Sequence, residues 1–319
     1  MQNHRTETLI ARGLKLSHLR ILAALGDTRA IARAAGQVGI TQPAASRLLA
    51  EIGTIAGQPV HQRTGRGIRL TLAGEALARR ARRVLMEMQD AERELAEIRA
   101  GGRGHVRIGS VTGPALDRVL PALRTWRLAQ PGTTVEVVVA TSDELADRLL
   151  DGRLDFAVGR LPDGIGTGLL HAETMAAEPV SLVVRAGHRL TRPPAIAPAM
   201  LLEYDWVMPG PESLLRQAVV RRLAEMGLPE PRQRLFTASF LLTLALLSQS
   251  NSIAPLATAV ADTFARGPNA PYAVVPIDLG IEVPPFGMIT RADADLPPAA
   301  RRLADLIRDM GPRTPGFAV

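Results

Sequence analysis

The spacing of apolar residues changes twice along the chain and divides it into three parts. Up to residue 71, apolar residues recur every three to four positions in short runs, which is typical of helices with one buried face. One long run then keeps helical spacing without interruption. Beyond it, short strand-like runs alternate with helix-like runs. The pattern predicts a small module at 14–71, a linker helix at 72–100 and an α/β region at 101–319.

The first part is predicted to contain three short helices. We expect them from Ser17 to the glycine of Gly26-Asp27, at 28–37, and from Thr41 or Gln42 onward. Pro43 suits the first turn of the third helix, because the N–H that it lacks would have no partner there. The tight turn Val38-Gly39-Ile40 precedes that helix. Short helices joined by such a turn are typical of a helix-turn-helix.

A β-hairpin is expected directly after the three helices. Two short extended runs, Val60–Arg63 and Ile68–Leu70, flank the flexible tip Thr64-Gly65-Arg66-Gly67. A hairpin in this position forms the wing of a winged helix-turn-helix. Arg66 at its tip is expected to enter a DNA minor groove or to contact phosphate, and a plain loop arginine is the alternative.

The third helix has two different faces. Its buried face has apolar residues at i, i+3, i+4 and i+7, namely Ala45, Leu48, Leu49 and Ile52. The other face carries Gln42, Ser46 and Arg47, with the methyl group of Ala44 beside them. Gln can bond adenine, Arg can bond guanine, Ser serves a base or a phosphate, and a methyl group can touch thymine. We therefore expect this face to contact bases in a major groove, with a solvated surface as the alternative; Thr41 and Arg33 are expected at phosphates.

The linker helix is expected from a cap at Thr71 to about Arg99, a length of roughly 40 Å. Its apolar stripe follows a heptad spacing and consists of Leu77, Ala81, Val84, Met88, Ala91, Leu95 and Ile98. Four arginines lie in its first half, at 79–83, and five acidic residues lie in its second half, at 87–97. An antiparallel pair would set basic against acidic residues, so we predict an antiparallel homodimer. A lone helix packed on its own chain is the alternative.

The third part is predicted to form two α/β lobes with parallel strands covered by helices. Strands are expected at 106–110, 135–140, 155–159, 180–185, 206–208, 253–256, 272–277 and 286–291. Helices are expected at 114–129, 142–150, 213–226, 239–248, 257–266 and 298–310. Lobe 1 is assigned to about 105–178 plus 282–319, and lobe 2 to about 179–281.

Charge is concentrated in the first part. Residues 1–100 hold 16 Lys and Arg against 9 Asp and Glu, whereas the remaining residues hold 22 of each. The whole net charge of +7 therefore lies in the first third, which suggests a polyanion as its partner. The chain has no cysteine, and its longest apolar run falls far short of the ~20 residues that a membrane span needs. With no signal peptide in the sequence, we expect a cytoplasmic protein without a membrane partner.

Several motifs carry a resemblance to a known family. Ala34-Ala35 and the stretch GITQPAASR at 39–47 resemble the signature "AA…(V/I)SQPA(L/V)SR" of LysR-type transcriptional regulators. RTGRGIRLTLAG at 63–74 is similar to their wing and linker start. LDFAVG at 154–159 matches "LD.ai", and SIAP at 252–255 resembles "G.ailP". The stretch 154–162 is similar to the branch that includes regulators of aromatic-acid and sugar metabolism.

The resemblance implies a winged helix-turn-helix, a dimerising linker helix and an effector domain built like a two-lobed periplasmic binding protein. It also implies a homodimer or homotetramer that binds promoter or operator DNA, a small-molecule co-inducer and RNA polymerase, with no cofactor. Three departures are His61 in place of a phenylalanine, Asp27-Thr28-Arg29-Ala30 in place of "GSFT", and Gln249-Ser250-Asn251 in place of a glycine-rich turn. The last lies near the expected effector cleft.

Positions where helices begin after strands are candidates for the effector site, because free N–H groups and hydroxyls there favour anions such as carboxylates. The candidates are Ser110, Val111, Thr112, Thr141, Ser142, Arg160, Ser239 and Asn251. Arg160 is expected to pair with a carboxylate, so the effector is expected to be anionic. Ordinary helix capping is the alternative for the hydroxyl residues.

Two other classes of protein are possible. The six histidines are scattered, and neither GxSxG, Walker A nor GxGxxG follows a strand, so we expect no catalytic residue, no metal site and no enzyme activity. A cytoplasmic small-molecule-binding protein of the periplasmic-binding-protein type, without regulatory DNA binding, is the second alternative. The basic first part argues against it.

Overall fold

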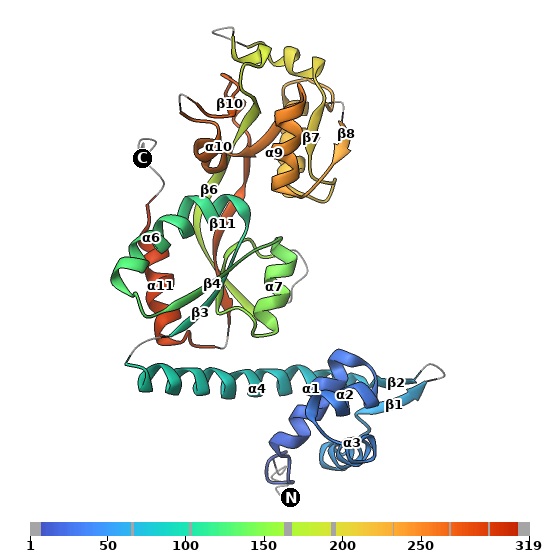
Figure 1. Cartoon of the computed structure of the whole chain (residues 1–319). Coiled ribbons are helices and arrows are strands. Elements are labelled where there is room, and N and C mark those ends of the chain that lie inside the picture. Colours follow the sequence, from blue (N-terminus) through green and yellow to red (C-terminus); the bar gives the residue numbers. More distant parts are fainter. Residues whose placement is uncertain are drawn as a thin grey trace, which may run out of the picture. The chain divides into compact units, whose positions relative to one another are not determined.

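The structure is a computed structural model, and it describes residues 8–64, 67–101, 104–162, 168–192, 196–231, 233–267, 269–292 and 294–311. The chain divides into two compact units, Met1–Arg99 and Ala100–Val319 (Figure 1). The first contains the helical module and the long helix, and the second is the α/β unit.

Three helices, a hairpin and one long helix form the first unit. They are α1 (Leu16–Thr28), α2 (Ile31–Val38), α3 (Gln42–Ala56), β1 (His61–Thr64), β2 (Gly67–Leu70) and α4 (Leu72–Arg99). The core joins α1, α2 and α3 with the start of α4, through residues such as Ile21, Leu25, Ala34 and Leu49. The hairpin pairs His61 with Leu70 in antiparallel register.

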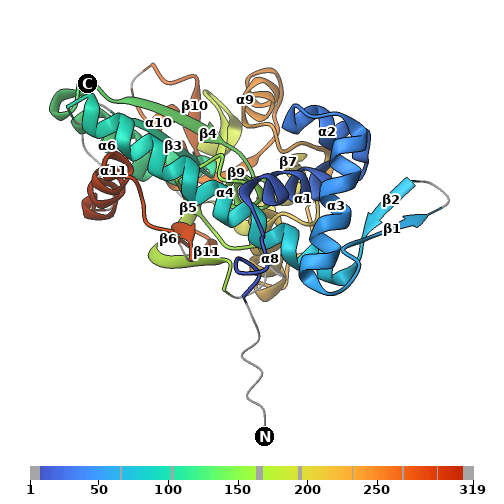
Figure 2. The same cartoon turned by 90° about the horizontal axis from the view of Figure 1, so that it is seen from below.

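The first helix differs from the expectation at both ends. Lys15, and not Ser17, is its N-cap, and the helix continues through Gly26-Asp27 to Thr28. Gly26 lies inside the helix and faces α4: a Cβ there would lie 2.6 Å from the guanidinium at the end of the flexible Arg82 side chain and 3.4 Å from Ala78. Asp27 accepts a hydrogen bond from Nε of Arg82 at 2.9 Å. The departure at position 27 therefore joins α1 to α4, which pack against each other in both views (Figures 1 and 2).

The start of α4 is locked onto the hairpin. Thr71 donates a hydrogen bond to the carbonyl of Pro59 at 2.7 Å and accepts one from the N–H of Gly74 at 3.1 Å. A Cβ on Gly74 would lie 1.8 Å from the carbonyl oxygen of Val60. The glycine of the LTLAG stretch is therefore required by the close approach of two backbones.

The α/β unit is built around one seven-stranded sheet. Its strands lie in the order β10-β6-β11-β5-β3-β4, with β9 paired to β6, while β7 and β8 form a small parallel sheet. The strands are β3 (His105–Ser110), β4 (Thr134–Val139), β5 (Phe156–Gly159), β6 (Leu170–Arg185), β7 (Trp206–Met208), β8 (Gln233–Phe236), β9 (Ala254–Ala257), β10 (Tyr272–Val274) and β11 (Glu282–Arg291). The helices are α5 (Thr112–Pro114), a π-helical turn (Ala115–Val119), α6 (Leu120–Ala129), α7 (Ser142–Leu150), 3-10 turns at Arg189–Thr191 and Pro198–Glu203, α8 (Leu214–Glu225), α9 (Phe240–Gln249), α10 (Thr258–Phe264) and α11 (Pro298–Asp309).

Two long strands connect two halves of this unit. β6 is a single strand of 16 residues, so the strand expected at 180–185 is only its second half. Its first half pairs with β11 and its second half with β9 and β10. Pairing with β11 is interrupted between Val283 and Phe286, where Pro284 and Pro285 lie. Separate buried cores lie on either side of this interruption, which we call the hinge.

Two further elements differ from the sequence expectation. The helix expected at 114–129 starts at Thr112 and contains a π-helical turn before α6. The strand β8 was not expected, because its sequence QRLF has no run of apolar residues; it forms by parallel pairing with the buried β7.

The two residues of the LD motif, Leu154 and Asp155, hold strands together inside the fold. The Asp155 carboxylate accepts a hydrogen bond from the backbone N–H of Arg107 at 2.8 Å and forms an ion pair with the Arg107 guanidinium at 3.0 Å. The side chain is fully buried. These bonds fix β5 against β3, while Leu154 enters the core of lobe 1.

Replacing Gly74 by alanine is expected to destabilise the first unit by about 1–3 kcal/mol, because the new methyl group would overlap the Val60 carbonyl. Calorimetry of the full-length protein should show a lower transition temperature for this unit. Gly36→Ala is the matched control, since its Cβ would meet no atom within 4 Å inside α2, and it should stabilise by about 0.5–1 kcal/mol. Equal transition temperatures for the two variants would contradict this account of Gly74.

Candidate nucleic-acid interface and effector region

Helix α3 is held by both of its ends and by one buried face. Thr41 is the N-cap, and its hydroxyl accepts a hydrogen bond from the N–H of Ala44 at 3.4 Å. Gly57 ends the helix in the left-handed conformation with φ of 72°. Ala45, Leu49 and Ile52 are completely buried against the rest of the module. The opposite face of the helix is therefore presented outward.

Four predicted DNA-binding residues lie on or beside this outward face. Gln42, Ser46 and Arg47 are exposed, and Ala44 is half-buried next to them. Within the described residues, the side chains of Gln42, Ser46 and Arg47 have no hydrogen-bond or ion-pair partner. Their donors and acceptors are consequently available to an external ligand. This is the combination that direct readout of base edges requires.

Two other predicted DNA-binding residues, Thr41 and Arg33, already make hydrogen bonds within the chain. The Thr41 hydroxyl is already used as the cap of α3. Arg33 is exposed on α2 and donates one hydrogen bond from Nη2 to the carbonyl of Thr28 at 2.5 Å, which leaves its other N–H groups for a phosphate. Arg66 lies outside the described residues.

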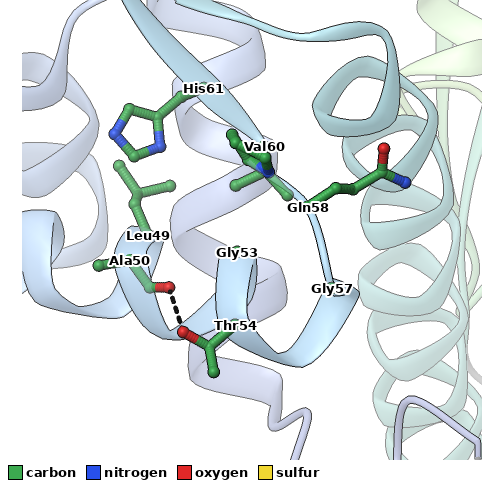
Figure 3. Close-up of a pocket in the computed structure, with 9 residues that line it drawn as sticks. Leu49, Ala50, Gly53, Thr54, Gly57, Gln58, Val60 and His61 are labelled. Carbon is green, nitrogen blue, oxygen red and sulfur yellow. Dashed lines mark hydrogen bonds between the residues drawn. The ribbon is translucent and has the colours of Figure 1, made fainter.

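A shallow pocket of about 430 Å³ lies between α3 and the start of the hairpin (Figure 3). Leu49, Val60 and His61 line it, together with the end of α3. The Nδ1 atom of His61 is buried without a hydrogen-bond partner among the described residues. The half-buried His61 therefore forms part of the wall of this pocket, which no signal in the sequence predicted.

The apolar stripe of α4 divides into a covered and an open section. Ala81 is buried and Leu77 is half-buried against the core of the same module, so these two are not available to a partner helix as predicted. Val84, Met88, Leu95 and Ile98 are 44–64% exposed, and Ala91 is exposed as well. The open section of the stripe therefore runs from Val84 to Ile98.

In the α/β unit, the carboxyl ends of the parallel strands face the hinge from both sides. In lobe 1, β3, β4 and β5 are parallel, and β5 ends at Gly159 opposite Gly287 on the hinge side of β11. In lobe 2, β9 ends at Ala257, which pairs with Val180 beside the hinge, and β7 runs parallel to it. Ligands of open α/β sheets bind outside the carboxyl ends of strands.

Four predicted effector residues lie at these strand ends with a hydroxyl that can still donate a hydrogen bond to a ligand. Ser142 and Thr112 are half-buried beyond β4 and β3, without a hydrogen-bond partner for either hydroxyl among the described residues. Thr141 caps α7 by accepting from the N–H of Glu144 at 3.4 Å. Ser239 caps α9 by accepting from the N–H of Leu242 at 3.3 Å. Both capping hydroxyls keep their own O–H to donate.

Two other predicted effector residues, Ser110 and Val111, use their polar groups in hydrogen bonds within the sheet. Ser110 is fully buried and donates its hydroxyl to backbone carbonyls, including that of Val158 at 3.2 Å. The N–H of Val111 donates to the same carbonyl at 3.0 Å. These hydrogen bonds join β3 to β5, so neither the Ser110 hydroxyl nor the Val111 N–H is free for a ligand, whereas the half-buried Val111 side chain stays a predicted part of the site.

Arg160 is paired inside the chain and not left for a carboxylate as expected. Its guanidinium forms an ion pair with Glu178 of β6 at 2.5 Å, and its Nε donates to the carbonyl of Pro284 at the hinge. The two charged side chains are only 10% and 11% exposed. Sequence reasoning missed Glu178, although a carboxylate between the apolar runs at 175–177 and 182–184 was a signal for it.

Glu178 also touches the first turn after β3. A Cβ on Gly113 would lie 1.7 Å from Oε1 of Glu178 and 2.9 Å from Cβ of Ala257. Because Gly113 of lobe 1 has no side chain, it can lie in contact with both Glu178 beside the hinge and Ala257 of lobe 2.

Asn251 lies at the far end of lobe 2 from the hinge. It accepts hydrogen bonds from Arg185, at 2.9 Å and 3.2 Å, and its carbonyl contacts Nε2 of His188 at 3.1 Å. Burial lowers the pKa of His188, whose Nδ1 accepts the N–H of Leu190. Asn251 thus ties the end of β6 to the start of β9, away from the strand ends at the hinge, and its place in the effector site stays a prediction.

Over the described residues, no helix combines the length and apolar character needed to cross a membrane. The same part of the chain contains no cluster of three His, Asp or Glu residues suited to a metal ion.

Comparisons with known proteins agree with this architecture. Residues 16–75 match the family model of the bacterial regulatory helix-turn-helix protein, lysR family, and residues 99–312 match that of the LysR substrate binding domain. The chain therefore belongs to the LysR family of DNA-binding transcriptional regulators, which have an effector-binding domain and are not enzymes.

Two curated relatives are HTH-type transcriptional regulators called GbpR. That of Rhizobium radiobacter is 42% identical over 81% of this chain and 86% of its own length, and that of Azospirillum brasilense is 35% identical over 92% and 86%. Among solved structures, a full-length OxyR variant from Pseudomonas aeruginosa is 21% identical, with a TM-score of 0.64 over 96% of this chain and 99% of that chain. CbnR complexed with its target DNA is 22% identical, with a TM-score of 0.52 over 92% and 99%. These two structures share the fold.

Proposed function

We propose that this regulator recognises operator DNA by inserting α3 into a major groove, with Gln42, Ser46 and Arg47 at base edges and Ala44 at a thymine methyl group. The observation that carries the proposal is the outward face of α3, whose polar groups have no partner among the described residues. Arg33, Thr41 and the wing residue Arg66 are assigned to phosphates or the minor groove. Binding should weaken steeply with salt, because cations neutralising phosphates release counterions.

Arg47→Ala is expected to weaken binding to the recognised sequence by ~1–3 kcal/mol, which is the value of a bidentate contact to guanine. The measurement is a titration of two labelled duplexes: one selected from a random pool by the wild-type protein, and a scrambled duplex of equal length. Binding to the scrambled duplex should fall much less. Arg127→Ala is the control, since it removes an exposed arginine of the α/β unit. Equal losses on both duplexes would make Arg47 a phosphate contact.

We infer that the open section of the α4 stripe pairs with a second copy of the chain. Val84, Met88, Leu95 and Ile98 would otherwise remain in water, and a heptad spacing suits a partner helix. An antiparallel homodimer whose pairing extends past the open section to the exposed Arg79 and Arg80 would set these arginines against the acidic residues at 87–97, and a further contact could extend the dimer to a homotetramer. Arg82 contributes little to this pairing, because it is bonded to Asp27 within its own module.

Met88→Glu combined with Leu95→Glu is expected to convert the dimer to a monomer in sedimentation equilibrium, because two buried apolar contacts per chain would become charged. Leu72→Glu is the matched control on the same helix: it is 86% exposed and lies off the stripe. A dimer that persists in the double variant would contradict the proposed interface.

Orientation is tested by exchanging the charges of both halves in one chain, with Arg79 and Arg80 changed to Glu and Glu92 and Glu94 changed to Arg. In an antiparallel pair this variant should self-associate as the wild type does and show no preference for wild-type partners. In a parallel pair, each half of the helix faces the same half of its partner. The variant should then prefer to dimerise with a wild-type chain, because opposite charges would face each other only in that mixed dimer.

We propose that a small-molecule co-inducer binds at the hinge-facing strand ends, to the hydroxyls of Thr112, Thr141, Ser142 and Ser239. Its binding would favour one arrangement of the lobes and so alter how the assembled subunits hold DNA and contact RNA polymerase. The protein would do this in the cytoplasm. The expected class remains an aromatic acid or a sugar-derived compound. An anionic effector must compete with Glu178 for Arg160, however, because these two side chains already neutralise each other.

Glu178→Gln is expected to free the Arg160 guanidinium and to increase the thermal stabilisation that aromatic acids or sugar acids produce. Uncharged sugars should stabilise the wild type and the variant equally. Thermal-shift measurements with the three compound classes test this. Acids that stabilise the wild type and the variant to the same degree would show that the ion pair does not compete with the ligand.

A further inference from the structure

His18 links the start of α1 to the DNA-recognising helix α3. Its side chain is 3% exposed. Nδ1 accepts the backbone N–H of Lys15 at 3.1 Å, and Nε2 lies 3.1 Å from Oε2 of Glu51 on α3. Because Nδ1 acts as an acceptor, the proton must be on Nε2, and the neutral ring therefore donates to the Glu51 carboxylate.

Glu51 is the residue that would otherwise pair with Arg47. The two side chains are four positions apart on α3, so they lie on neighbouring turns of the same side of the helix. Opposite charges at this spacing attract each other. In the structure, however, Glu51 bonds to His18, and Arg47 has no partner among the described residues.

We propose that His18 is a positioning residue for DNA recognition: it holds the Glu51 carboxylate and so keeps the Arg47 guanidinium free for a base. This inference rests on the proposed role of Arg47. A carboxylate on Arg47 would have to be displaced before a guanine could bind, and it would also bring negative charge toward the phosphates. His18 contacts no base in this account.

Two substitutions separate the two hydrogen bonds of the imidazole. In His18→Asn, the amide oxygen can replace Nδ1 at the Lys15 N–H, but the shorter side chain does not reach Glu51. In His18→Gln, the longer side chain can place its amide NH₂ near Glu51. We therefore expect His18→Asn to lower the ratio of specific to non-specific DNA affinity about twofold, and His18→Gln to leave it at the wild-type value. The probes are the selected and the scrambled duplex described above.

Removing the competing carboxylate gives a readout that a purely structural role of His18 would not produce. Glu51→Gln in the His18→Asn background should restore the ratio to the wild-type value. Glu51→Gln alone should leave it unchanged. Failure of this rescue, or a loss of specificity in Glu51→Gln alone, would overturn the proposal.

The same comparison in an Arg47→Ala background distinguishes this inference from the proposed function. If Arg47→Ala itself lowers the ratio, His18→Asn should have no additional effect on it. An additional loss would show that His18 acts by another route. If Arg47→Ala leaves the ratio unchanged, the proposed function of Arg47 fails, and the inference fails with it. Thermal unfolding of every variant confirms that the first unit is folded at the assay temperature.

Discussion

The structure depends on the packing of one side of α3. Ala45, Leu49 and Ile52 are completely removed from water by α1, α2 and the hairpin. Rotating or sliding the helix would expose these three residues, which bury apolar area at roughly 25 cal/mol per Å². Their burial therefore fixes which side chains face outward. The chemistry of DNA recognition follows from a hydrophobic constraint on the opposite side of the same helix.

Close backbone contacts extend this constraint to the linker helix. Gly74 allows the start of α4 to approach the backbone of Val60 at a distance that any side chain would prevent. The Asp27–Arg82 bond and the Thr71 cap add directional contacts at the same junction. The open section of the α4 stripe is thus held in a fixed relation to α3. In a dimer, this would set the spacing between two recognition helices, on which the spacing of DNA half-sites depends.

Much of this could be predicted from local sequence. The start of α3 at its cap Thr41 and the bounds of α7 could be predicted, and the exposed face of α3 follows from its helical spacing. The pattern of short helices and a hairpin predicted the winged module, and the family signature added the role of the α/β region as an effector domain; the family models confirm the helix-turn-helix and the effector domain. What could not be predicted depends on partners distant in sequence. Three such contacts form only when the chain has folded: the Arg160–Glu178 ion pair, the Arg82–Asp27 ion pair and the hydrogen bond from Arg185 to Asn251. Periodicity also gave no sign that one strand, β6, would extend through both lobes.

The central claim is that α3 contacts base edges in the major groove, and methylation interference tests it most directly. Guanine N7 lies in the major groove, and its methylation blocks an arginine that bonds N7 and O6. In the duplex selected by the wild-type protein, the account predicts interference at guanine N7 in two segments, separated by one or more helical turns. Binding that tolerates N7 methylation throughout, but is blocked by methylation of adenine N3 in the minor groove, would contradict it.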